Sequence, residues 1–113
     1  MLTIYHNPRC SKSRQTLELI QKNSNKEITI VEYLKQPLNK NQILNLLTQL
    51  NCKPVDMMRI KEVEFKAQEL ANADDQQLIK AMISTPKLIE RPIVSDGNKA
   101  VIGRPPENVL ALC

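Results

Sequence analysis

The chain has 113 residues, 42% of them hydrophobic and 25% charged, which is the composition of one globular domain. It contains no apolar run of the ~20 residues that a membrane-spanning helix needs, and its first residues lack the features of a secretory signal. We therefore expect a cytoplasmic protein without membrane attachment. The net charge of +4 permits anionic ligands, but the basic residues form no single block. Because only 3% of the residues are aromatic, little is available for base stacking, which argues against nucleic-acid binding.

The first third of the chain predicts a strand, a helix and a second strand. Residues 2–5 predict a short strand, and residues 6–9 predict a loop. Apolar residues at helical spacing predict a helix from Ser11 to about Lys22, whose first turn Ser11 or Ser13 could cap. The β-branched residues within 27–33 predict a second strand.

The middle of the chain predicts helices. Leucine and isoleucine residues on one side predict a helix over residues 38–50, and residues 53–66 predict a broken helical stretch. The acidic pair at 74–75 opens another helix, which Pro86 ends. These helices form an insertion at about residues 38–86.

The last part predicts a hairpin and a helix. Residues 92–94 and 100–102 predict two strands joined by the turn-forming segment 95–99. Pro105 and Pro106 introduce a final helix that ends near residue 112. The element order β-α-β, helices, β-β-α is that of an α/β thioredoxin-like fold with a mixed sheet and a helical insertion. We expect residues 1–113 to form one such domain.

The three cysteines are widely spaced. Cys10, Cys52 and Cys113 form neither a disulfide framework nor a set with metal-ligand spacing, so no metal site is predicted. Cys52 lies in a polar stretch between helices, and Cys113 is the last residue printed, so inert thiols are expected at both positions. Only Cys10 has a sequence setting that indicates reactivity.

Cys10 follows the predicted loop and directly precedes the predicted helix. The free N–H groups and the partial positive charge at a helix start stabilise an anion such as a thiolate. Arg9, Lys12 and Arg14 add positive charge nearby, as His6 would if protonated. Electropositive helix starts lower the pKa of a thiol from its usual value of ~8.5. The sequence therefore predicts that Cys10 is a nucleophile.

Ser13 occupies the position at which a dithiol oxidoreductase carries its second cysteine. With no local resolving thiol, a catalytic cycle needs an external thiol such as glutathione or another protein. The Ser13 hydroxyl could hydrogen-bond the Cys10 thiolate or cap the helix, and the two roles are compatible.

Four blocks of the sequence resemble one known family. Residues 5–14, YHNPRCSKSR, resemble the N-terminal signature of glutaredoxin-dependent arsenate reductases of the ArsC type. Three further blocks resemble the segments that carry the oxyanion-binding arginines of that family: Met57–Arg59, Glu90–Val94 and Ile102–Glu107. The resemblance runs from about residue 2 to residue 112 and is strongest to the short YfgD-like branch.

The resemblance implies a reaction. The Cys10 thiolate would attack arsenate and form a thioarsenate adduct. Glutathione, a reducing co-substrate rather than a bound cofactor, would attack that adduct, and glutaredoxin would complete the reduction with release of arsenite.

The resemblance also implies which residues bind the substrate. Arg59, Arg91 and Arg104 would hold the oxyanion, since a guanidinium donates two parallel charge-assisted hydrogen bonds. From the sequence alone, Arg59 also fits an ordinary solvated charge. Arg91 and Arg104 each precede a proline and border a strand, which favours an extended backbone.

Two supporting residues follow from the same resemblance. His6 would lie beside the thiolate and tune its pKa, although an isolated histidine also fits a core or surface position. Pro92 would be the proline before the third strand, facing the active cysteine in thioredoxin-like folds. We therefore expect a cis Arg91–Pro92 bond, a form found in only ~5% of such bonds.

Two other functions compete with arsenate reduction. One is a monothiol oxidoreductase that acts on glutathione mixed disulfides, which would not need three arginines. The other is a non-enzymatic regulator of the Spx type that binds RNA polymerase. Spx-type proteins usually carry a second cysteine where this chain has Ser13.

Overall fold

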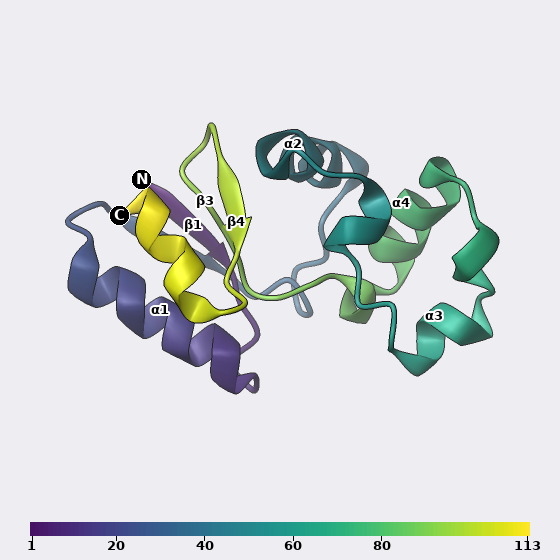
Figure 1. Ribbon diagram of the computed structural model, residues 1–113, viewed down its shortest axis with the longest axis horizontal. Coiled ribbons are helices and arrows are strands. Elements are labelled where there is room, and N and C mark those ends of the chain that lie inside the picture. The colour runs from purple at the N-terminus through teal and green to yellow at the C-terminus, as the bar shows by residue number, and fades with distance from the viewer. The chain divides into compact units, whose positions relative to one another are not determined.

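In the computed structural model, which describes residues 1–113, both ends of the chain contribute strands to one sheet (Figure 1). The chain divides into two compact units. One contains Met1–Gln36 together with Arg91–Cys113, and the other contains Pro37–Glu90. The helices predicted between residues 38 and 86 all lie in the second unit.

The sheet of the first unit has four strands in the order β2-β1-β3-β4. β1 (Leu2–Tyr5) runs parallel to β2 (Ile28–Val31) and antiparallel to β3 (Ile93–Ser95), and β3 is antiparallel to β4 (Ala100–Ile102). The sheet is mixed, and its order of elements is the predicted thioredoxin-like one. β2 ends earlier than predicted because the Glu32 carbonyl accepts turn hydrogen bonds from the Lys35 and Gln36 N–H groups.

Two helices pack on this sheet through an aliphatic core. Figure 1 shows α1 (Ser11–Asn23) beside the C-terminal η4 (Pro106–Leu112, yellow), and the two are in contact. Leu2 and Ile4 alternate along β1 and so point to one face. They join residues of β3 and both helices in a buried cluster: Leu2, Ile4, Ile20, Val94, Val109 and Leu112. The final helix was predicted, and its turns are of the tighter 3₁₀ type.

The predicted serine cap of α1 is wrong. The residue at the N-cap is Cys10, and no side chain caps the helix. Ser11 makes no capping bond, and the Ser13 hydroxyl is engaged by the loop that precedes the helix. The first turn of α1, which directly follows Cys10, therefore has backbone N–H groups that donate to no capping side chain.

The second unit contains α2 (Lys40–Leu50), α3 (Val63–Ala67) and α4 (Asp75–Ser84), with short 3₁₀ turns between them. Two capping boxes start the longer helices. The side chains of Asn39 and Asp74 each accept from the backbone N–H three residues ahead, which satisfies one of the donors left free at a helix start. The predicted helix over 38–50 therefore begins two residues later.

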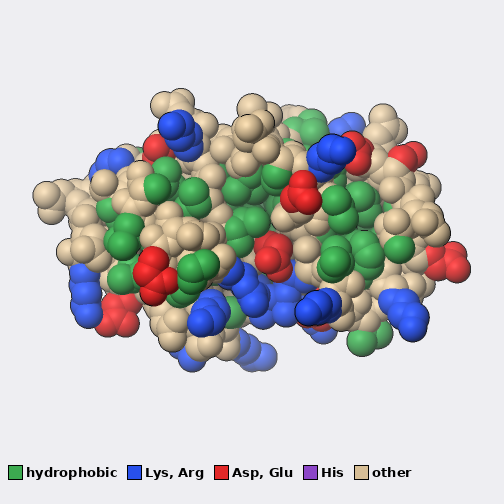
Figure 2. Space-filling view, viewed as in Figure 1, with side chains coloured by type: hydrophobic (Ala, Val, Ile, Leu, Met, Phe, Trp, Pro, Cys, Tyr) green, Lys and Arg blue, Asp and Glu red, His purple; other side chains and the backbone are tan.

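Cations and carboxylates are mixed at the surface. Figure 2 shows acidic side chains among the basic ones on the face that it views. Some form local pairs, as Lys22 and Glu18 do on α1 at 2.9 Å. No helix combines the length and apolar character that a bilayer span requires.

Candidate functional site

Cys10 sits where the β1–α1 loop turns into α1. Its backbone N–H donates to the Asn7 carbonyl (3.0 Å), and its own carbonyl accepts the first helical bond, from Arg14 N–H (3.0 Å). The thiol is therefore carried at the N-cap by a backbone that is fixed on both sides. The N-terminus of a helix favours a negative charge at this position.

The surroundings of Cys10 favour the thiolate. Burial alone would raise the pKa of Cys10, but three neighbours outweigh it, and the net effect is a lowered pKa. The backbone N–H groups of Ser13 and Lys12 at the start of the helix lower this pKa, and the Arg91 guanidinium lowers it by its charge and by its hydrogen bonding. The sequence predicted nearby cations for this role. The cation that acts is instead Arg91, from the far end of the sequence.

His6 is buried, with 6% of its surface exposed, and it bonds Ser13. Its Nδ1 lies 2.6 Å from the Ser13 hydroxyl oxygen, which also accepts from Asn7 N–H at 3.0 Å. Burial lowers the pKa of His6, Glu32 raises it, and Arg14 lowers it further, with a net lowering. His6 is therefore mostly uncharged at neutral pH and adds no positive charge beside the thiol. Its contacts tie the loop to the helix.

Asn7 is a further residue of this loop, and its role was not predicted. Its side-chain Oδ1 accepts from Arg9 N–H at 3.0 Å, which forms an Asx turn, while its backbone bonds both Ser13 and Cys10. The asparagine–proline pair at positions 7 and 8 is a typical turn signal and could have identified it.

Arg91 and Pro92 directly precede β3, on the side of that strand that faces α1. The Arg91–Pro92 bond is cis, as predicted, and Arg104–Pro105 is a second cis bond that was not predicted. Two nitrogens of the Arg91 guanidinium, Nε and Nη1, are buried and have no hydrogen-bond partner. Buried polar groups are nearly always paired in native proteins, so two unpaired donors on a cation mark a place where a ligand can bind.

Gly103 packs closely between Pro92 and Thr16 of α1. Its N–H donates to the Pro92 carbonyl at 2.8 Å. A Cβ at this position would lie 2.7 Å from the Thr16 hydroxyl oxygen and 2.9 Å from Pro92 Cγ. Only glycine allows this approach. The position of one of only two glycines in the chain, at the end of a predicted strand, was a usable signal.

Gly103→Ala is expected to destabilise the first unit. Thr16 is fully buried, so it cannot swing away from the added methyl group, and overpacking of this kind costs roughly 1–3 kcal/mol. Denaturant unfolding would measure the loss. Thr16→Ala in the same chain should recover part of it, because it removes two of the three close atoms. Full stability of the single variant would contradict this packing.

The other two predicted arginines have different local surroundings. The Arg104 side chain is exposed after β4, and its backbone N–H donates to the Ile102 carbonyl. Arg59 belongs to the second unit, where Glu62 and Glu90 surround its guanidinium. The structure thus brings Cys10 and Arg91 together, with their supporting residues His6, Ser13 and Pro92, within the first unit.

The thiols are expected to differ in reactivity. Cys10 and Cys52 are both partly exposed, but burial and Asp56 raise the pKa of Cys52 whereas that of Cys10 is lowered. Only the thiolate is alkylated, and its fraction falls as the pH drops below the pKa. The alkylation rate of Cys10, plotted against pH, should therefore have its midpoint at a lower pH than that of Cys52. Below both pKa values, Cys10 should react about tenfold faster for each unit by which the two pKa values differ. Iodoacetamide labelling followed by peptide mass spectrometry measures both, and faster labelling of Cys52 at neutral pH would contradict it.

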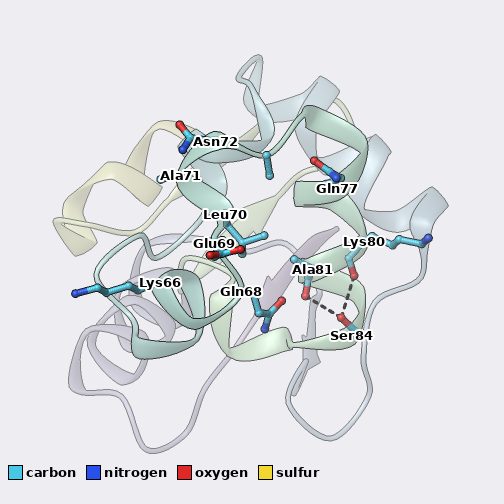
Figure 3. Close-up of a pocket in the computed structure, with 11 residues that line it drawn as sticks. Lys66, Gln68, Glu69, Leu70, Ala71, Asn72, Gln77, Lys80, Ala81 and Ser84 are labelled. Atoms are coloured by element: carbon cyan, nitrogen blue, oxygen red, sulfur yellow. Dashed lines mark hydrogen bonds between the residues drawn. The ribbon is translucent and has the colours of Figure 1, made fainter.

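A pocket in the second unit is lined by residues of a different chemistry. The second unit has an open hollow of about 1020 Å³ beside α4 (Figure 3). Lys66 and Lys80 at its rim point away from it, and the Ser84 hydroxyl donates to backbone carbonyls of α4. No thiol or imidazole lines it. No group of three or more His, Cys, Asp or Glu side chains could hold a metal ion.

Known proteins resemble this chain over nearly its whole length. Residues 5–112 match the ArsC family. An uncharacterized protein named YfgD from Escherichia coli K12 is 46% identical over 112 aligned positions, and the alignment covers 96% of this chain and 93% of that protein. An arsenate reductase from Haemophilus influenzae is 45% identical, with 96% of both chains covered. The solved structure of an arsenate reductase from Vibrio cholerae superposes with a TM-score of 0.93 at 41% identity, covering 99% of this chain and 97% of that one.

Proposed function

The chain belongs to the ArsC family, and from this premise we propose that it is an arsenate reductase whose nucleophile is the Cys10 thiolate. The observation that carries the proposal is the pairing of Cys10 with Arg91. One residue is a thiol whose pKa is lowered, and the other is a guanidinium with two buried, unpartnered donors. A buried donor left unpaired costs about 1–3 kcal/mol, so an oxyanion that accepts from both is favoured at this position.

The first step is the attack of Cys10 on arsenic(V). A sulfur–arsenic bond forms, and one arsenate oxygen leaves as water after taking up a proton. Arg91 donates to the oxygens on which negative charge is concentrated, and the backbone N–H groups at the start of α1 face the sulfur. The product is a thioarsenate adduct on Cys10.

The remaining steps reduce arsenic(V) to arsenic(III). The glutathione thiol forms a second sulfur–arsenic bond and displaces a further arsenate oxygen as water. The glutaredoxin thiolate then attacks the glutathione sulfur, so the bond from that sulfur to arsenic breaks and its electron pair stays on arsenic, which becomes arsenic(III). The two thiols end as a mixed disulfide and so supply the two electrons. Water then cleaves the remaining arsenic–Cys10 bond, which releases arsenite and restores the Cys10 thiolate. An external reductant fits this chain because Ser13 stands where a second thiol would be, and its hydroxyl is bonded to the loop. Such a cycle requires the reducing conditions of the cytoplasm, where we place the protein.

The other predicted site residues have roles in this proposal as well. The family resemblance supports Arg59 and Arg104 as further oxyanion ligands. His6 and Ser13 fix the loop that carries Cys10, and Pro92 fixes the segment that carries Arg91.

The proposal is tested by arsenite formation from arsenate with purified protein, glutathione and glutaredoxin. We expect turnover in the complete mixture and its loss when either thiol reductant is omitted. Absence of arsenite in the complete mixture would overturn the proposal. Turnover of a glutathione mixed disulfide in place of arsenate would identify the protein as a monothiol oxidoreductase. Capture of RNA polymerase that does not depend on Cys10 would favour a regulator.

A further inference from the structure

Arg59 is held by a carboxylate that the proposed reaction does not use. Its Nη1 lies 2.7 Å from Glu62 Oε1, and the two side chains are only 24% and 16% exposed. At this distance the two groups form a close ion pair, which limited exposure to solvent strengthens. Glu90 is farther away, with its Oε1 4.0 Å from Arg59 Nε.

Glu62 is itself fixed from a second side. Its other oxygen, Oε2, lies 3.5 Å from Lys87 Nζ. Its backbone N–H donates to the Arg59 carbonyl at 3.2 Å, which closes the turn between the two residues. The Arg59 N–H in turn donates to the Leu88 carbonyl at 2.7 Å. Both the backbone and the end of the Arg59 side chain are therefore held in place within the second unit.

We propose that Glu62 is a positioning residue that holds the Arg59 guanidinium by Nη1 and so presets it for the oxyanion. This inference rests on the proposed function, in which Arg59 binds the substrate. A guanidinium has five N–H donors in a planar fork, so an ion pair with Glu62 at Nη1 and the Glu90 carboxylate on the Nε side leave the donors on Nη2 for a ligand. An arginine side chain that is not fixed beforehand loses conformational entropy when the ligand binds, which weakens the affinity for the ligand.

Charge alone would act in the opposite direction. Glu62 is negative, so it repels an anion bound by Arg59, and its removal would strengthen binding if nothing else changed. Positioning and charge thus predict changes of opposite sign in the KM for arsenate.

Three variants separate the two effects. Glu62→Ala removes both the hold and the charge, whereas Glu62→Gln removes the charge but keeps an oxygen that can accept from Arg59 Nη1. Glu64→Gln is the matched control, because Glu64 shares Lys87 at 3.3 Å but forms no ion pair with Arg59. We expect Glu62→Ala to raise the KM for arsenate about fivefold with a smaller change in kcat, the penalty for ordering one long side chain. Glu62→Gln should restore most of the affinity, and Glu64→Gln should behave as the unchanged protein.

A second measurement keeps the inference separate from the proposed activity. The Arg59 Nε–H signal in NMR should be rigid in the unchanged protein and in Glu62→Gln, and mobile in Glu62→Ala. A lower KM in both Glu62 variants, or a rigid Arg59 in Glu62→Ala, would overturn the positioning role. If the unchanged protein forms no arsenite at all, the proposed function fails, whereas the NMR comparison still tests whether Glu62 holds Arg59.

Discussion

Replacement of Cys10 by serine is expected to lower arsenate turnover by at least about 10³-fold, because a hydroxyl stays protonated where a thiol ionises. The helix start and Arg91 lower the pKa of the Cys10 thiol, but they cannot ionise a group as weakly acidic as serine. Arsenite measured under saturating glutathione and glutaredoxin gives the rate. The variant should fold normally, since serine is nearly isosteric and the N-cap favours it.

The other two cysteines provide matched controls for this substitution. Cys52→Ser and Cys113→Ser should each retain turnover within about twofold, as expected of substitutions away from the reacting atoms. Burial and Asp56 raise the pKa of Cys52, and Cys113 is an exposed residue whose thiol bonds the Val109 carbonyl at 3.6 Å. Loss of activity on removal of either thiol would show that a second cysteine takes part, which the present mechanism does not allow.

Replacement of Arg91 by alanine is expected to lower kcat/KM for arsenate by about 10²–10³-fold, the usual effect of removing one donor to a developing oxyanion. The same change should raise the pKa of Cys10, because Arg91 stabilises the thiolate by charge and by a hydrogen bond. Arg91→Lys should restore part of the pKa effect but little of kcat/KM, since an ammonium supplies charge without the planar fork. Thiolate absorbance against pH and steady-state kinetics measure the two effects separately.

Arg9 is the natural control for Arg91. It is adjacent to Cys10 in the sequence, but its side chain is exposed and it is not among the groups that lower the pKa of that thiol. Arg9→Gln should leave both the pKa of Cys10 and kcat/KM nearly unchanged. Equal losses in the Arg9 and Arg91 variants would mean that general positive charge, rather than the Arg91 fork, supports the site.

The sequence predicts the part of the site that local patterns determine. The strand predicted at residues 2–5 and the helix predicted from Ser11 place Cys10 between a strand and a helix, and the structure confirms this. The hairpin strands and the cis bond before Pro92 are also as predicted. Each of these features depends on a few neighbouring residues or on a motif that matches a family.

The features that the sequence did not predict depend on contacts between distant residues. The resemblance identified Arg91 as a substrate ligand, but its effect on the pKa of Cys10 was not predicted, because the two residues are 81 positions apart and no spacing rule connects them. The burial that keeps His6 uncharged results from tertiary packing, as does the contact between Gly103 and Thr16. Serine is a typical N-cap residue, but the Ser13 hydroxyl bonds His6 and Asn7 of the loop and does not cap the helix.

The most direct test of the oxyanion site is a crystal structure of the unchanged protein soaked with arsenate in the absence of thiol reductants. We expect the arsenic atom beside Cys10 Sγ, with arsenate oxygens that accept from Arg91 Nε and Nη1, the two donors that are now unpartnered. Arsenate bound elsewhere, or no arsenate with those two donors still unpaired, would contradict the proposed site.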